Sequence, residues 1–245
     1  MTVGALADLG GDKKRVEAEI EKLGVEESIE LEWKSVNRTG ITATKFDVKV
    51  PPGEQHRSHR DIAAMIERSE LSDGVKQRAL SIFRHIAEAE GKIHGVPVEE
   101  VHFHEVGALD SIVDIVATAI LFEELAPDVI SASSVALGSG KVKTMHGLYP
   151  VPPPATLEIL KGAPVEAGDS KAELTTPTGA GILAASVDSW GSIPRMQVAQ
   201  IGYGAGTREF PDRPNVLRVL VGTLSEQDGA HHDHPHNHSH AHDEH

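Results

Sequence analysis

The sequence of 245 residues contains no cysteine, which narrows the chemistry available to it. Without thiols the chain can form no disulfide, no thiolate zinc site and no cysteine nucleophile. Any metal ion must therefore be held by imidazole, carboxylate, backbone or water. The absence also fits a reducing compartment, so we expect a cytoplasmic protein.

Basic charge and long apolar runs are scarce as well. The chain has 23 Lys and Arg against 37 Asp and Glu, which gives a net charge of −14. Without a basic face to displace counterions, we expect no nucleic-acid partner. There is no run of about 18 apolar residues and no basic-then-apolar leader, so we expect no membrane span and no signal peptide. The hydrophobic content of 39% and the length of 245 residues are typical of a globular protein with a substantial core.

The hydrophobic pattern predicts a mixed α/β fold. A β-hairpin is expected over 28–50, closed by a turn at 37–40. Strands are expected at 129–137, 196–202 and 215–221. Helical spacing predicts helices over 12–23, 58–69, 72–94, 111–125, 154–161 and 178–187. The helix at 111–125 is apolar almost all round, so it should be central.

The chain divides in composition into three parts. We expect a helical lobe with the hairpin over 1–126, an α/β lobe with Gly/Pro-rich loops over 127–224, and a disordered His-rich tail over 225–245. The opening MTVGALADLGGD is typical of a helix already under way, without an N-cap. We therefore expect a strand and a loop to precede Met1 in the complete protein.

The stretch HFHEVGALDSIVD, residues 102–114, gathers potential metal ligands at the entrance to the most apolar helix. An extended backbone would send two imidazoles to one face. Two carboxylates at i and i+4 would share a face of the helix if it begins near residue 109. The candidate ligands are His102, His104, Glu105, Asp110 and Asp114. Such a set without sulfur suits nickel, manganese, zinc or magnesium, and the spacing does not choose among them.

Each of these residues also has an ordinary explanation. Asp110 would be a helix N-cap, Asp114 a partner of the helix dipole, and the histidines plain strand residues. For one residue the ordinary explanation is the stronger. For five within thirteen residues we favour a metal site.

The end of the chain, AHHDHPHNHSHAHDEH, is a second signal for metal. Its histidines are interrupted by Asp, Pro, Asn and Ser, unlike the plain run of an engineered tag. Neutral imidazoles would collect Ni²⁺, Cu²⁺ or Zn²⁺ at neutral pH and release them in acid. The candidate ligands here are His231, His232, His234, His236, His238, His240, His242 and His245.

Three loops in the second half are candidates for holding a phosphorylated ligand. They are LGSGKVKTMHGLYPVPPPAT (137–156), TTPTGAG (175–181) and GYGAGTR (202–208). The second should open a helix, whose free N–H groups suit phosphate. Tight turns explain any one loop equally well. The candidate residues are Lys141, Lys143, His146, Thr176, Thr178, Gly179, Gly204, Gly206 and Arg208.

HRSHRD, residues 56–61, has two interpretations. His56 and His59 would sit at a site, with Arg57 and Arg60 contacting an anion. Because the stretch runs into a helix, a solvated first turn is the stronger interpretation.

Four segments together resemble the LarC family of nickel-insertion proteins. They are HFHEVGALDSIVDIV, GSG…HGLYPVPPPAT, ELTTPTGAGIL and GYGAGTREFPDRPNVLRVLVG. They occur in the family's order, and a histidine-rich segment is also a family trait. The resemblance spans the chain to about residue 224.

The resemblance implies a nickel chelatase of the lyase class. Family members insert Ni²⁺ into pyridinium-3,5-bisthiocarboxylic acid mononucleotide, with CTP hydrolysis and a divalent ion such as Mn²⁺ or Mg²⁺. The product is the cofactor of lactate racemase and related apoenzymes, which are the downstream recipients.

Family members also continue past the histidine-rich region into a second, nucleotide-using portion. We therefore expect this chain to need that C-terminal LarC-like portion as a partner for activity. Two alternatives stay open: a nickel store or metallochaperone without catalysis, and a metal-dependent phosphohydrolase using the same acids.

Overall fold

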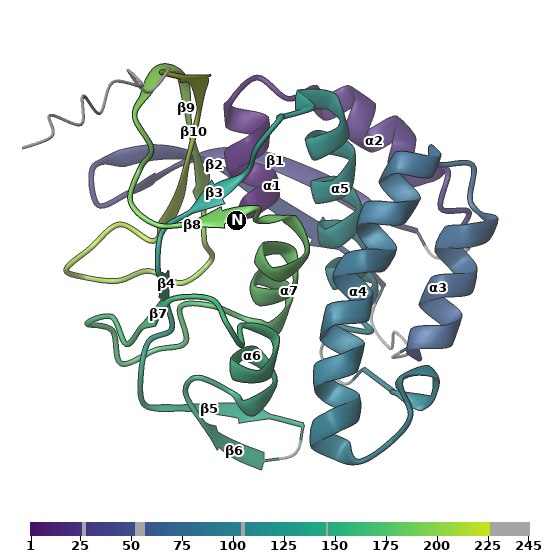
Figure 1. The fold of residues 1–245 in the computed structure, drawn as a ribbon. Helices are drawn as coiled ribbons and strands as arrows, with labels where there is room; N and C mark the ends of the chain where they lie inside the picture. Colours follow the sequence, from purple (N-terminus) through teal and green to yellow (C-terminus); the bar gives the residue numbers. More distant parts are fainter. Residues whose placement is uncertain (26–27, 52–56, 104–105, 146, 226–245) are drawn as a thin grey trace, which may run out of the picture.

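The computed structural model describes residues 1–25, 28–51, 57–103, 106–145 and 147–225. It has the mixed α/β fold that the sequence predicts (Figure 1). The elements in chain order are α1 (Thr2–Asp8), α2 (Lys13–Glu21), β1 (Glu30–Arg38), β2 (Ile41–Lys49), α3 (His59–Arg68), α4 (Asp73–His94), the 3₁₀ turn η1 (Val98–Glu100), α5 (Leu109–Leu125), β3 (Ser131–Ala132), β4 (Val135–Ala136), β5 (Lys141–Thr144), β6 (Gly147–Pro150), α6 (Pro154–Ile159), β7 (Val165–Glu166), α7 (Pro177–Ser186), β8 (Ser189–Trp190), β9 (Met196–Ala205) and β10 (Val216–Leu224).

The largest sheet joins strands from both ends of the chain in the order β1-β2-β9-β10. The predicted hairpin forms its first pair, and Thr39 and Gly40 close it with φ angles of 46° and 89°. Positive φ at both positions gives the turn whose twist matches the strands. β2 then pairs in parallel with β9, where Thr44 lies opposite Gly204. The sheet thus combines strands from both of the expected lobes, whose boundary at residue 126 stays a prediction.

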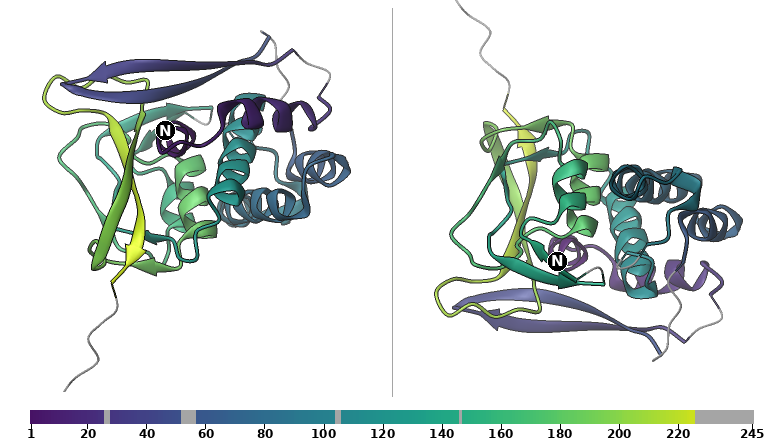
Figure 2. Two further views of the ribbon diagram at one scale, coloured as in Figure 1. Left: turned by 90° about the horizontal axis from the view of Figure 1, so that it is seen from above. Right: turned by 90° about the horizontal axis from the view of Figure 1, so that it is seen from below.

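Helix α1 lies directly on this sheet because glycines allow the two backbones to approach (Figure 2). A Cβ built on Gly204 would be 1.9 Å from the carbonyl oxygen of Met1, and one on Gly202 would be 2.2 Å from that of Ala5. Asp8, at the end of the helix, accepts hydrogen bonds from Thr44 Oγ1 at 2.8 Å and from Tyr203 N at 2.9 Å. These contacts fix the helix that begins at Thr2, as the opening sequence predicts.

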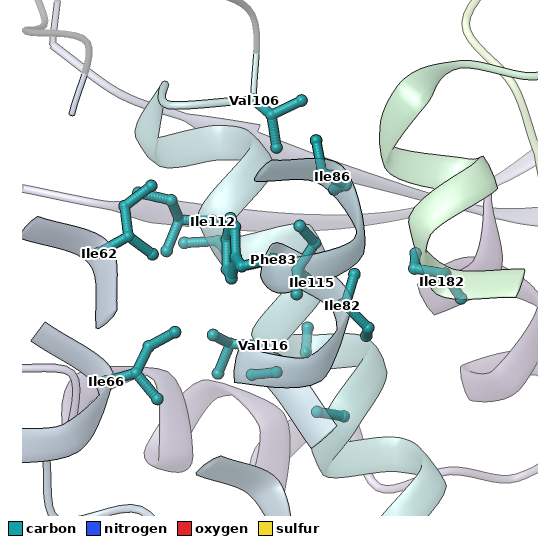
Figure 3. Close-up of a cluster of buried hydrophobic side chains, with 14 of the residues drawn as sticks. Ile62, Ile66, Ile82, Phe83, Ile86, Val106, Ile112, Ile115, Val116 and Ile182 are labelled. Atoms are coloured by element: carbon teal, nitrogen blue, oxygen red, sulfur yellow. The ribbon is translucent and has the colours of Figure 1, made fainter. Parts of the chain in front are cut away.

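The main core is built around α4 and α5. α4 packs against α3, α5, α6 and α7 (Figures 1 and 2). Isoleucines from α3, α4 and α5 surround Phe83, which is fully buried (Figure 3). Burying such a side chain contributes about 1.5–3 kcal/mol. The prediction that 111–125 is a central helix is confirmed, and no helix in the described ranges is long and apolar enough to cross a membrane.

Three local predictions differ from the structure. The expected strand at 129–137 is two short strands, because β3 pairs with β8 whereas β4 pairs with β7. β5 and β6 form an antiparallel pair that the Gly- and Pro-rich sequence did not indicate. At the start of HFHE, where an extended strand is expected, the described residues form one isolated bridge, between Ser58 and His102.

Candidate functional site

His102 is exposed and lies against the beginning of α3. Its bridge to Ser58 is antiparallel, and His59 N donates to Val101 O at 2.9 Å beside it. A further backbone hydrogen bond joins Arg57 N to Gly107 O at 3.2 Å. The two histidine-containing motifs, HRSHRD and HFHEVGA, are therefore held together where the structure describes them. His104 and Glu105 lie outside the described residues.

Asp110 and Asp114 occupy the first turns of α5, which begins at Leu109 as the metal-site hypothesis requires. The N-cap is Ala108, so the alternative that made Asp110 the cap is wrong. Asp110 lies one residue inside the helix, and its Oδ1 accepts from Ser111 N at 2.7 Å.

Among the candidate ligands that the structure describes, Asp114 is the carboxyl whose pKa is perturbed. Burial raises its pKa to about 6, and the charge of the Met1 amine opposes this rise. The neighbouring Asp110 and Asp47 raise the pKa further. Asp47, on β2, is thus an acidic neighbour that the sequence did not indicate, because a hairpin distant in the chain brings it there.

The described ligands do not complete a metal site by themselves. Among the residues that the structure describes, no three His, Asp or Glu side chains are placed to hold one metal ion. His102, Asp110 and Asp114 therefore do not form such a group. With His104 and Glu105 outside the described residues, the five-residue site stays a prediction, and so do the tail ligands at 231–245.

Asp114 should make the metal-free chain less stable as the pH rises. The folded carboxyl titrates at about 6, above its ordinary value of 3.8, so the folded state binds the proton more tightly. The stability present below the unfolded pKa is then lost as the pH rises through about 6. The wild-type free energy of unfolding should therefore fall with pH relative to that of Asp114→Asn. Between about pH 4 and about pH 7 the difference should change by about 2 kcal/mol in favour of the variant. Urea unfolding of wild type and Asp114→Asn at the two pH values measures this change. If the two free energies of unfolding change equally with pH, the prediction is wrong.

The candidate phosphate contacts are spread over several elements. Lys141 and Lys143 are exposed on β5, two residues apart and thus on one face of the hairpin. Arg208 is exposed in the loop between β9 and β10, and its carbonyl accepts from Asn215 Nδ2 at 2.8 Å. His146 lies outside the described residues. The role of these cations in binding stays a prediction.

The glycines of GYGAG have packing explanations that need no ligand. Gly204 is within β9, against α1. Gly206 N donates to Asn215 O at 2.9 Å, and a Cβ on Gly206 would be 2.3 Å from Asn215 Nδ2. Close approach of backbone and side chain therefore accounts for both residues.

TTPTGAG does open a helix, as predicted. Thr176 is the N-cap of α7, and its hydroxyl accepts from Gly179 N at 3.2 Å. One of the N–H groups proposed for phosphate is thus already bonded within the helix.

Replacing Thr176 by alanine should lower the free energy of unfolding by about 1 kcal/mol, because the cap is lost. Thr178→Ala is the matched control, since Thr178 lies inside the helix and does not cap it. Denaturant titration of the two variants compares them. Equal stabilities would show that the capping bond contributes nothing.

The fold and the candidate residues together define a mixed α/β protein whose possible metal ligands are all nitrogen and oxygen donors. Comparison with known families is more specific. Residues 1–242 match the family described as nickel insertion protein, so the chain belongs to that family.

Relatives agree with this assignment. A Geobacillus kaustophilus protein named pyridinium-3,5-bisthiocarboxylic acid mononucleotide nickel insertion protein is 55% identical over 91% of this chain and 56% of its own length. A Staphylococcus epidermidis protein of the same name is 44% identical over 90% of this chain and 55% of its length. The chain thus spans a little over half the length of these relatives. No solved structure matches it.

Proposed function

We propose that this chain is the nickel-carrying part of an enzyme that inserts Ni²⁺ into pyridinium-3,5-bisthiocarboxylic acid mononucleotide. The observation that carries the proposal is the match to the nickel insertion family over residues 1–242, with a 55% identical relative named for this reaction. Nickel is the cargo of the reaction and passes through the protein to the nucleotide.

The donor set supplies a physical reason for transfer in that direction. With no cysteine, the chain can offer nickel no thiolate, and its candidate ligands are nitrogen and oxygen donors of moderate affinity. The thiocarboxylate sulfurs of the nucleotide are softer donors and favour the metal more strongly. A protein rich in thiolates would compete with its own substrate for nickel. The net charge of −14 raises the local concentration of the cation.

In this proposal, three parts of the chain have different roles. The tail histidines gather nickel, and the motif at 102–114 holds the ion for transfer. Lys141, Lys143 and Arg208, together with the backbone N–H groups of Thr176 and Thr178, hold the phosphate of the nucleotide. Asp114 binds a metal ion only as the carboxylate, so its raised pKa should weaken nickel binding below about pH 6.

CTP with Mn²⁺ or Mg²⁺ would act through the further portion that the longer relatives possess. We propose that portion as the partner of this chain and a lactate racemase-type apoenzyme as the recipient of the product. A cytoplasmic location fits the whole scheme.

The proposal is tested by supplying Ni²⁺, CTP, Mn²⁺ and the thiolated nucleotide to this chain, alone and with the remaining portion of a family member. Mass spectrometry of the nucleotide should show nickel incorporation in the combined reaction. Tight nickel binding without incorporation in either reaction would favour a nickel store. Phosphate release that survives His102→Ala, again without incorporation, would favour a phosphohydrolase.

A further inference from the structure

Two segments far apart in the sequence form one small surface around His102. Residues 57–59 run antiparallel to residues 101–103, joined by the bridge between Ser58 and His102. Gly107 secures the contact, since a Cβ there would be 2.7 Å from the carbonyl oxygen of Arg57. The beginning of α3 therefore forms a wall beside His102.

The bridge places Ser58 and His102 side by side. The hydrogen bond from His59 N to Val101 O joins the neighbouring residues, so Ser58 and His102 form the non-hydrogen-bonded kind of antiparallel pair. In this kind of pair the two side chains project to the same face and lie closest together.

The carboxylate of Asp61 is held on this same surface. Its Oδ2 accepts from the Ser58 hydroxyl at 2.6 Å and from Ser58 N at 3.2 Å. Within the described residues, Oδ1 of Asp61 accepts no hydrogen bond. Asp61 itself is exposed at the surface.

The charge of Asp61 suits a cation at this position. The hydrogen bonds from Ser58 lower the pKa of Asp61, and the positive form of His102 lowers it further. Asp61 is therefore a carboxylate at neutral pH. An imidazole and a carboxylate are donor types that a borderline divalent ion accepts.

We propose that Asp61 and His102 bind the same Ni²⁺ ion, with Ser58 positioning the carboxylate. This inference rests on the proposed function, and it assigns a ligand outside the motif at 102–114. Neither of these donors, which come from separate segments, is a thiolate. Such an ion is held weakly enough for the thiocarboxylate sulfurs to remove it.

The test measures Ni²⁺ binding by calorimetry in the full-length chain with its eight tail histidines replaced by alanine. In this background, Asp61→Asn should weaken binding about tenfold or more, and His102→Ala by at least as much. Ser58→Ala should weaken it less, because the carboxylate is present but no longer held. Nickel-induced broadening of the amide signals of Ser58 and Phe103 should disappear in the first two variants.

Asp73→Asn is the matched control. Asp73 is an acidic residue in the first turn of α4, as Asp61 is in α3, and it should leave nickel binding unchanged. Asparagine at position 61 can still accept from Ser58, so urea unfolding should show nearly equal stabilities for the two variants.

The outcomes separate this inference from the proposed function. Unchanged binding in Asp61→Asn, with weakened binding in His102→Ala, overturns Asp61 as a ligand, and nickel insertion can still be active. Unchanged binding in both variants overturns the shared site. If the wild-type chain binds nickel through Asp61 and His102 but no nickel is inserted into the nucleotide, the proposed function is wrong and the shared binding site stands.

Discussion

Replacing Gly204 by alanine should lower the free energy of unfolding by about 3 kcal/mol, the upper end of the usual cost of overpacking. The new Cβ would lie 1.9 Å from the carbonyl oxygen of Met1 and 2.5 Å from Ala5 N. Both are backbone atoms of the α1 region, so no side-chain rotation relieves the contact. The helix must move away from β9, and its anchor through Asp8 to Tyr203 N weakens with it.

Gly179→Ala is the control for this prediction. The nearest atom to a Cβ there is 3.7 Å away, and alanine favours the helix at this position. Urea unfolding should therefore show Gly179→Ala at or above wild-type stability and Gly204→Ala far below it. If Gly204→Ala keeps wild-type stability, the close packing of α1 on the sheet is incorrect.

Replacing all eight tail histidines by alanine should remove most of the nickel that each chain can bind. The tail offers eight imidazoles, whereas the proposed inner site holds a single ion. A tethered reservoir raises the effective nickel concentration at that site, so half-maximal insertion should need about tenfold more free nickel without it. At saturating nickel the insertion rate should be nearly unchanged.

The measurement is nickel stoichiometry by dialysis, together with insertion at graded nickel concentrations. A chain with Asp233→Asn, Asp243→Asn and Glu244→Gln is the control, because it alters tail charge but keeps the imidazoles. If the histidine substitutions abolish all binding, including that at His102, the inner site is wrong and the tail alone binds nickel.

The helices could be predicted from the sequence because the spacing of apolar side chains is a local signal. The 3.6-residue spacing of apolar side chains predicted α4, and the all-apolar run predicted the central place of α5. The β5–β6 hairpin was missed because Gly and Pro interrupt its alternation. The run at 129–137 predicts one strand because its pattern does not show that β3 and β4 have different partners, β8 and β7.

The site was harder to predict because its neighbours come from distant segments. Asp61 carries a local signal, since Ser58 and Asp61 have the spacing of a helix capping box. That signal indicates only a helix start. Its place beside His102 depends on the bridge that joins two distant loops. In the same way, Asp47 is near Asp114 only because the β1–β2 hairpin folds over α5.

The glycines of GYGAG show a second limit of prediction from sequence, because one pattern fits two roles. A glycine after a strand can cradle a phosphate, or it can let a helix approach the backbone, and sequence does not distinguish the two. At Gly204 the neighbouring atoms belong to α1 and its N-cap Met1, so packing alone explains the residue.

The central claim is that nickel passes from this chain to the nucleotide. It is tested most directly by loading the full chain with radioactive nickel, removing free metal, and adding the thiolated nucleotide, CTP, Mn²⁺ and the remaining portion of a family member. We expect nickel to leave the protein at the rate at which it appears in the nucleotide, with His102→Ala slowing both. Nickel that stays on the protein while the nucleotide acquires metal only from solution would contradict the account.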